Sequence, residues 1–361
     1  MDYNSNSKYT EQVYNDLLML EKYVSESSAS EIVQTANYLV NRIKQNVENL
    51  KEVSDENLIL RYQELIKQVI KSMGLRDYSG KKIIFSVKDM PGIGCGLADK
   101  LRGVVTLYSF CKENNIDFFI NWVYPNDLRN YLIPNNYNWA INDYEISNDT
   151  KITDCDYGNL SINDFLGVVE NKLENTDTIS VFTNNFYQQK DFGQLFNELF
   201  KPVDRLQIGI DFHLKQIGCE YISATFRFQQ LLGDFKERDY DPILPLAERE
   251  PLINKCINHL TNIFNQNNYK KILVTSDSIS FLNKVKMFDF VYVIPGQIAH
   301  IGHDHGHNVD VYMKSFLDFY LLTHSKCIYS VSEGKMYDSG FPKVASRINN
   351  TKYVKMDYRL R

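Results

Sequence analysis

The spacing of apolar residues divides the chain into a helical N-terminal part and a longer part in which strands and helices alternate. In the first part, apolar residues recur at intervals of three and four over 9–24, 29–50 and 54–73, which predicts three amphipathic helices. Short polar connections join these segments, so we expect residues 1–78 to form a helical N-terminal extension. Its Lys and Glu positions favour a solvated surface, and a protein partner or a dimer through these helices is the alternative.

Residues 81–122 predict one complete strand, loop, helix and strand unit. Short apolar runs at 83–87 and 116–122 flank a glycine-containing loop and a segment, 98–112, whose apolar residues recur at helical spacing. This arrangement is the βαβ unit of a parallel sheet, with the glycine loop at the carboxyl end of its first strand. Open α/β sheets bind their ligands at that edge.

The rest of the chain continues this alternation. We expect strands at 178–182, 220–228, 271–275, 290–294 and 327–331, and helices at 191–200, 204–219, 248–266, 278–286, 309–323 and 341–349. Strands and helices that alternate with short loops predict parallel, doubly wound sheets. The predicted fold class is therefore α/β, with a first domain at 79–235 and a second domain at 236–361.

The glycine loop and the helix that follows it offer a site for an anion. Gly92, Gly94 and Gly96 let the backbone approach a ligand closely, and the free N–H groups of a helix N-terminus attract negative charge. Arg102 in the first helical turns opposes the helix dipole unless an anion lies nearby. The spacing is not the dinucleotide fingerprint, because Asn121 stands where that motif needs an acid. A tight turn without a ligand is the alternative.

Arg227 ends the predicted strand at 220–228 and lies between two phenylalanines. A guanidinium held rigidly at a strand end matches a phosphate or a carboxylate with a bidentate fork. The alternative is an ion pair with a nearby acid such as Asp234. The loops at the carboxyl edge of the second predicted sheet are 276–278, 295–308 and 332–341.

Composition narrows the function classes. The 361 residues are 43% hydrophobic and 24% charged with a formal net charge of −5, which argues against nucleic-acid binding. No apolar run approaches the roughly 18 residues of a membrane span, and the N-terminus lacks the layout of a signal peptide. The six cysteines form no CxxC pair, which is typical of a reducing compartment. We therefore expect a cytoplasmic protein.

Five short motifs carry a resemblance to a known family. In chain order they are Gly92-Ile-Gly94-Cys-Gly96-Leu-Ala-Asp-Lys-Leu-Arg102, Ala224-Thr-Phe-Arg227-Phe, Leu273-Val-Thr-Ser-Asp277-Ser, Leu317-Asp318-Phe-Tyr-Leu-Leu322 and Tyr337-Asp-Ser339-Gly-Phe341. This order over residues 81–350 resembles the metal-independent fucosyltransferases, a superfamily that contains α1,2-, α1,6- and protein O-fucosyltransferases and a nodulation fucosyltransferase. The resemblance implies a GT-B fold of two facing Rossmann-like domains. It also implies GDP-fucose as donor, a glycan acceptor of the kind used in polysaccharide biosynthesis, inversion at the anomeric carbon and no metal or other cofactor.

The resemblance also implies roles for individual residues. Arg227 corresponds to the arginine that contacts the diphosphate and supports the departure of GDP. Asp277, with Ser276 and Ser278 beside it, falls where the family places an acid near the nucleoside. A Ser-x-Phe element, here Ser339, Gly340 and Phe341, contacts phosphate and base, and His300 or His303 is available to contact phosphate or acceptor.

The catalytic base is left open by two departures from the family pattern. Thr225 stands where many relatives have a histidine, and the residues between Arg227 and Asp234 look like an insertion. Candidates for the base are Asp99, Asp127 and Asp234. The missing histidine also motivates a second hypothesis, a protein of this fold that binds a nucleotide sugar without turning it over.

A histidine-rich loop supports a third hypothesis. Residues 300–307 contain four imidazoles, which resembles a metal site when they are considered alone. A metal-dependent hydrolase built on this loop is the less favoured alternative, because short histidine-rich loops also bind metal adventitiously. We expect no metal site in the functional protein.

Overall fold

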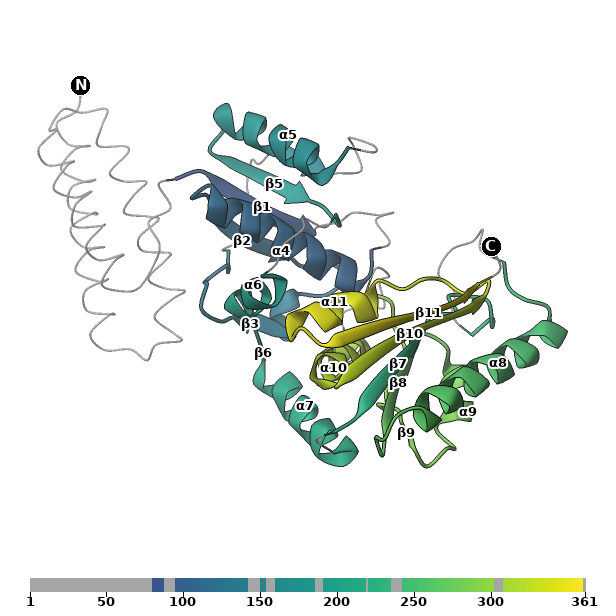
Figure 1. Cartoon of the computed structure of the whole chain (residues 1–361). Coiled ribbons are helices and arrows are strands. Elements are labelled where there is room, and N and C mark those ends of the chain that lie inside the picture. The colour runs from purple at the N-terminus through teal and green to yellow at the C-terminus, as the bar shows by residue number, and fades with distance from the viewer. Residues whose placement is uncertain are drawn as a thin grey trace, which may run out of the picture. The chain divides into compact units, whose positions relative to one another are not determined.

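The computed structural model of this chain describes residues 80–87, 95–141, 150–153, 160–185, 191–218, 220–234, 242–301 and 308–359 (Figure 1). The chain divides into two compact units, 1–80 and 81–361. The predicted helical extension at 1–78 lies outside the described residues. The second unit contains two parallel sheets with helices packed on them, which confirms the predicted α/β class.

The first sheet has four parallel strands in the order β2-β1-β5-β4. Its strands are β1 (Lys82–Val87), β2 (Asp117–Trp122), β4 (Thr150–Thr153) and β5 (Thr178–Phe182), and its helices are α4 (Leu97–Glu113) and α5 (Ile162–Glu174). β1 is buried at all but its first position. A parallel strand that is covered on both faces has a nearly continuous apolar sequence, as β1 has. The predicted βαβ unit is therefore β1, α4 and β2.

Gly103 fixes how closely α4 approaches the first sheet. A β-carbon at this position would lie 1.8 Å from the backbone oxygen of Thr183, just beyond β5. Only glycine permits that approach. The packing brings the first turns of α4 next to Asn184, which follows β5.

A linking region joins the two sheets. It contains η1 (Leu128–Asn130), α6 (Phe192–Leu199), α7 (Asp204–Ile217) and the short antiparallel strands β3 (Leu132–Pro134) and β6 (Phe200–Pro202). α6 and α7 lie at the predicted helices 191–200 and 204–219.

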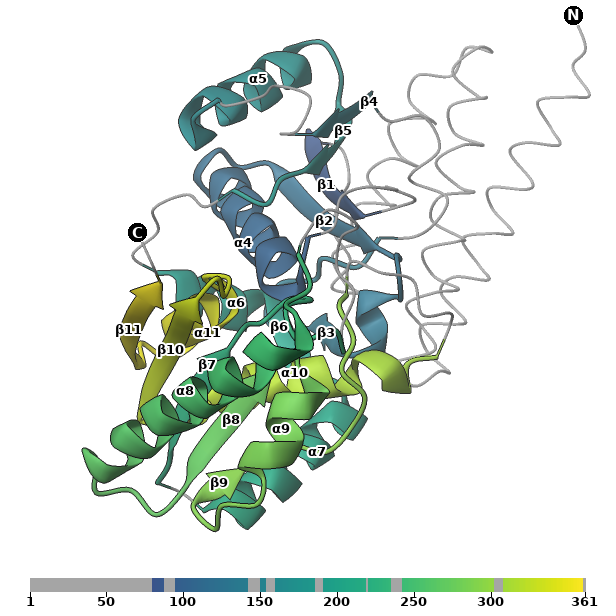
Figure 2. The same ribbon diagram turned by 90° about the vertical axis from the view of Figure 1, so that its right-hand side faces the viewer.

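The second sheet has five parallel strands in the order β11-β10-β7-β8-β9. Its strands are β7 (Ile222–Phe226), β8 (Ile272–Ser276), β9 (Val291–Tyr292), β10 (Cys327–Gly334) and β11 (Lys352–Arg359). Its helices are α8 (Leu246–Asn265), α9 (Ile279–Val285), α10 (Asp310–His324) and α11 (Phe341–Ile348). α8 and α9 lie on one face and α10 on the other, as the two views show (Figures 1 and 2). Alternate residues of β8 follow this division, since Ile272 and Val274 belong to the core under α8 and Leu273 to the core under α10.

Helix α10 belongs to the core of the first half as well as covering the second sheet. Tyr312 and Phe316 of α10 are fully buried in the same cluster as the apolar residues of β1 and α4. The ring of Tyr131 stacks on Phe316 with centroids 4.2 Å apart, and its hydroxyl donates to the carbonyl of Val309 at 2.8 Å. α10 is therefore in a position to form part of any site between the two sheets.

Candidate active site

A cavity of about 480 Å³ lies where the two sheets meet. Its walls come from the start of α4, the carboxyl ends of β7 and β8, the segment 297–301, the middle of α10 and the start of α11. This volume falls in the range of small-molecule sites. Ten of the predicted site residues line it: Gly96, Asp99, Arg102, Arg227, Ser276, Asp277, His300, Ser339, Gly340 and Phe341.

Arg227 and Asp277 form an ion pair in the wall of this cavity, with Asp277 buried and Arg227 half-buried. They follow β7 and β8, whose last residues are paired in register, so the two side chains meet. Nη1 of Arg227 lies 3.0 Å from Oδ2 of Asp277. The carboxylate also accepts from the backbone N–H groups of Phe228 at 2.8 Å and Gln229 at 2.6 Å. Burial raises the pKa of Asp277, and Arg227 and these N–H groups oppose that rise.

Asp277 has a structural role in addition to the one that the resemblance implies. It lines the cavity, and its hydrogen bonds hold the turn after β7 and the guanidinium of Arg227. Gln229 in this turn has a φ of 52°, which is uncommon for a residue other than glycine. The carboxylate therefore stabilises a constrained turn that presents Arg227 to the cavity.

Two other predicted residues, Ser278 and Asp234, have structural contacts and are not among the described residues that line the cavity. The hydroxyl of Ser278 caps α9 by accepting from the N–H of Phe281 at 3.1 Å. The carboxylate of Asp234 accepts from Ser278 Oγ at 2.8 Å and from the N–H of Ser280 at 2.6 Å. Asp234 thus supports the start of α9, and it does not pair with Arg227.

The start of α11 forms part of the cavity wall. Ser339, Gly340 and Phe341 line the cavity, and the hydroxyl of Ser339 accepts from the N–H of Phe341 at 3.3 Å. The loop before this helix is fixed at Tyr337, whose N–H donates to the carbonyl of Arg227 at 3.1 Å. The N–H of Phe341 is thus taken up by Ser339 and Pro342 has no N–H, so it is the dipole of this helix N-terminus, held at a fixed place near Arg227, that favours an anion.

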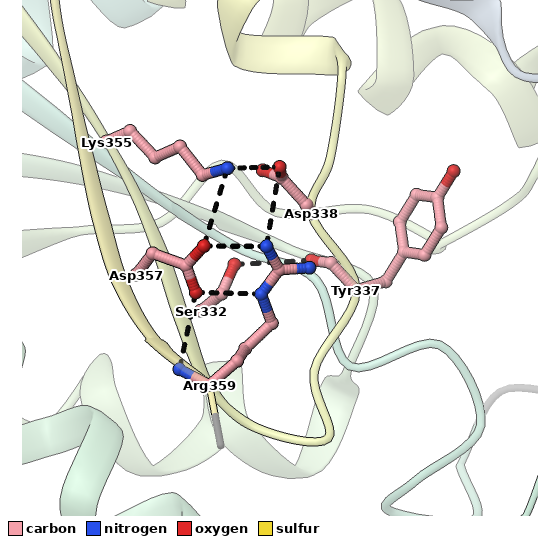
Figure 3. A network of polar contacts seen from close by, with 6 residues as sticks. All are labelled: Ser332, Tyr337, Asp338, Lys355, Asp357 and Arg359. Atoms are coloured by element: carbon pink, nitrogen blue, oxygen red, sulfur yellow. Dashed lines mark hydrogen bonds and ion pairs between the residues drawn. The ribbon is translucent and has the colours of Figure 1, made fainter. Parts of the chain in front are cut away.

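A polar network anchors the same loop to the edge strand β11 (Figure 3). Asp338 pairs with Lys355 at 2.5 Å and with Arg359 at 3.7 Å, and Arg359 pairs with Asp357 at 2.6 Å. The side chain of Tyr337 points away from this network (Figure 3) and is 52% exposed. The network thus holds the loop that carries Ser339 in place.

Helix α10 contributes a second ion pair that the sequence analysis did not assign to the site. Nζ of Lys314 lies 2.7 Å from Oδ2 of Asp318, and both residues line the cavity and are buried. Burial raises the pKa of Asp318, against the opposing charge of Lys314. Within the part of the chain that the structure describes, Oδ1 of Asp318 is buried and has no hydrogen-bond partner. A ligand with N–H donors would satisfy it.

The start of α4 brings Asp99 and Arg102 to the opposite wall. Asp99 accepts from the N–H of Gly96 at 3.3 Å and pairs with Arg102 at 3.0 Å. Arg102 also donates from Nε to the carbonyl of Asn184 at 2.6 Å. Arg102, which was predicted to bind an anionic ligand, is therefore paired within the protein. Gly92 and Gly94 of the same loop lie outside the described residues.

Asp127, the remaining candidate base, lies elsewhere. It caps η1 by accepting from the N–H of Arg129 at 2.8 Å and pairs with the Arg129 side chain at 2.6 Å. His303 and most of the histidine-rich loop, 302–307, are outside the described residues. Among the residues that are described, no group of three or more His, Cys, Asp or Glu side chains is placed to hold a metal ion. None of the described helices is long and apolar enough to cross a membrane.

Comparison with solved structures identifies the fold. One NodZ α-1,6-fucosyltransferase structure, soaked with GDP-fucose, matches with a TM-score of 0.51 at 14% identity, over 75% of this chain and 93% of that one. Another NodZ structure, from Bradyrhizobium, matches at 0.50 and 12% identity over 77% and 95%. A variant of Arabidopsis thaliana FUT1 in complex with GDP matches at 0.50 and 12% identity over 88% and 78%. The chain thus has the GT-B fold of these proteins, which confirms the predicted fold class.

Sequence comparison adds nothing to this result. No family model matches the chain, and no curated protein matches it. Identities of 12 to 14% to the solved structures show the fold alone.

Proposed function

We propose that this protein is a glycosyltransferase that moves fucose from GDP-fucose to a hydroxyl of a glycan, with inversion and without a metal. The observation that carries the proposal is the Arg227–Asp277 pair, 3.0 Å apart, in the wall of a cavity that the start of α11 also lines. It is supported by the fold shared with NodZ and FUT1 structures that were soaked with GDP-fucose or contain GDP.

Departure of a nucleoside diphosphate requires stabilisation of negative charge. When the bond between the anomeric carbon and the β-phosphate oxygen breaks, its electron pair stays on the diphosphate. Arg227 is held by Asp277 and by its backbone neighbours, so it does not have to reorganise as that charge develops. A preorganised guanidinium and the positive end of a helix dipole stabilise such charge in the role that a divalent cation plays elsewhere.

The buried carboxylate of Asp318 favours guanine as the base of the donor. Its Oδ2 is paired with Lys314, whereas its Oδ1 lacks a partner among the described residues. Guanine presents an amino donor that adenine and the pyrimidines do not place in the same position. Filling an unsatisfied buried acceptor is worth about 1–3 kcal/mol. GDP should therefore bind more tightly than IDP, which lacks that amino group, and both more tightly than UDP.

Calorimetry with GDP, IDP and UDP, followed by an assay of GDP release from GDP-fucose, tests the proposal. We expect Arg227→Ala to weaken GDP binding and to abolish GDP release. The matched control is Arg129→Ala, which removes another aspartate-paired arginine that does not line the cavity. Tighter binding of UDP than of GDP would show that the donor is not a GDP-sugar. Equal effects of the two substitutions would contradict the role assigned to Arg227.

A nucleotide-sugar-binding protein without turnover is the second candidate. The hydroxyl of Thr225 lies 2.8 Å from that of Thr275, so the position where relatives carry a histidine holds a hydroxyl pair instead. GDP binding without GDP release over hours would favour this candidate. Undiminished GDP release in excess EDTA would exclude the metal-dependent hydrolase.

A further inference from the structure

The segment after β9 reaches the start of α4, which belongs to the first sheet. Nζ of Lys100 in α4 donates to the carbonyl of Ile301 at 2.9 Å. Lys100 is 1% exposed, and its ammonium lies 5.2 Å from the centre of the Trp122 ring. A buried hydrogen bond from one half thus fixes the backbone of the other half beside His300.

The imidazole of His300 and the carboxylate of Asp99 gather around the same glycine. A β-carbon built on Gly96 would lie 3.5 Å from Nε2 of His300 and 3.7 Å from Oδ2 of Asp99. All three residues line the cavity. Glycine at this position leaves room for a small group between the imidazole and the carboxylate.

Every carboxylate that lines the described part of the cavity is already paired with a cation. Asp277 pairs with Arg227, Asp318 with Lys314 and Asp99 with Arg102. Both oxygens of Asp99 and both of Asp277 already accept from protein donors, and Oδ1 of Asp318 is the acceptor assigned to the guanine amino group. Imidazole changes charge between about pH 5 and 8, which suits a base at neutral pH.

We propose that Nε2 of His300 is the general base of the reaction, an assignment that rests on the proposed function. The attacking hydroxyl forms its bond to the anomeric carbon and gives its proton to Nε2 of His300. The bond from that carbon to the β-phosphate oxygen breaks, and GDP leaves with the electron pair. The carboxylate of Asp99 stabilises the imidazolium that results, and Lys100 acts as a positioning residue through Ile301.

The charged and titratable groups around His300 come from both halves. The described charged and titratable residues that line the same cavity are Cys95, Asp99, Arg102, Arg227, Asp277, Lys314, Asp318 and Tyr337, and Lys100 lies behind Ile301. The carboxylate of Asp99, which lies beside Gly96 as Nε2 of His300 does, favours the protonated imidazole, whereas the cations oppose protonation. The pH dependence of the rate reports their combined effect.

The test uses the full-length chain with water as the acceptor. GDP release from GDP-fucose is measured from about pH 5 to 9 for the parent and for His300→Gln, together with GDP affinity. We expect the rate of the parent to rise with pH through the imidazole titration. His300→Gln should lose about a hundredfold or more and the pH-dependent rise, while its affinity for GDP stays within about threefold of the parent. The control is His324→Gln, at an exposed histidine that ends α10 and does not line the cavity.

Rescue by added imidazole distinguishes a catalytic role of His300 from a structural one. In His300→Ala, added imidazole should restore GDP release, because a free base can enter the space that the side chain leaves. A rate of His300→Gln within about threefold of the parent, or an unchanged pH profile, would overturn the assignment of the base. A parent protein that binds no GDP or releases none from GDP-fucose would instead overturn the proposed function.

Discussion

Asp277 holds the arginine on which the proposed reaction depends, so Asp277→Asn tests the arrangement. The carboxylate lies 3.0 Å from Arg227 and accepts two backbone N–H groups, from Phe228 and Gln229. Asparagine keeps the shape and one acceptor oxygen, but its amide nitrogen has to face a donor. The substitution therefore leaves Arg227 without its counter-charge and one backbone N–H without an acceptor.

The size of the effect follows from burial. The side chains of Arg227 and Asp277 are 18% and 4% exposed. Removing one partner of a buried ion pair costs about 3–5 kcal/mol. Burial raises the pKa of Asp277, so the charged carboxylate already carries a desolvation cost, and we take the lower end, about 3 kcal/mol. For a unit of this size that corresponds to a fall of roughly 5 to 10 °C in the unfolding midpoint.

Thermal unfolding at neutral pH, followed by circular dichroism, measures this fall. The control is Asp357→Asn, which also removes the partner of an arginine, Arg359 at 2.6 Å, but in an exposed network (Figure 3). Exposed ion pairs contribute little, so we expect no resolvable change there. Equal falls in the two variants, or an Asp277→Asn midpoint within about 1 °C of the parent, would refute the reasoning.

Two further predictions concern the packing of α4. Gly103→Ala places a β-carbon 1.8 Å from the Thr183 carbonyl oxygen. In urea titrations it should lower the free energy of unfolding by more than the roughly 1–3 kcal/mol of ordinary overpacking. Gly167→Ala on α5, where a β-carbon meets no described atom within 4 Å, should instead stabilise by about 0.5–1 kcal/mol, and equal effects would contradict the packing argument. Burial lowers the pKa of Lys100 from 10.5 to about 8. Between about pH 8 and 10.5, Lys100 keeps its proton in the unfolded chain but has lost it in the folded protein. The free energy of unfolding therefore rises with pH by about 3 kcal/mol over this range. Lys100→Met should lack this rise in urea titrations, and an unchanged rise would contradict it.

Most of the fold could be predicted from hydrophobic spacing, because buried parallel strands and amphipathic helices have distinct periods. The edge strand β11 was not predicted. Its residues are exposed or half-buried and several are charged, so no buried apolar run marks it in the sequence. Only its pairing with β10 shows it to be a strand. The predicted strand at 290–294 is shortened to Val291–Tyr292 in β9.

The candidate site was harder to predict, because its contacts depend on burial. A lysine and an aspartate four residues apart on a helix are typical of an exposed ion pair, and only the packing of α10 shows that Lys314 and Asp318 are buried in a cavity wall. Arg227 was found because it ends a strand between aromatic residues. Its partner Asp277 is 50 residues away in the sequence, whereas Asp234, the nearer acid, caps α9.

The charges of the described residues in the cavity wall balance. Among these residues, the carboxylates Asp99, Asp277 and Asp318 are paired with the cations Arg102, Arg227 and Lys314. Paired cations attract a resting diphosphate less than an unpaired cationic cluster would. The oriented guanidinium and the dipole of α11 gain most as charge develops on the departing GDP. Interactions that strengthen in the transition state raise turnover more than affinity, so the pairing of each cation favours catalysis over tight binding of the product.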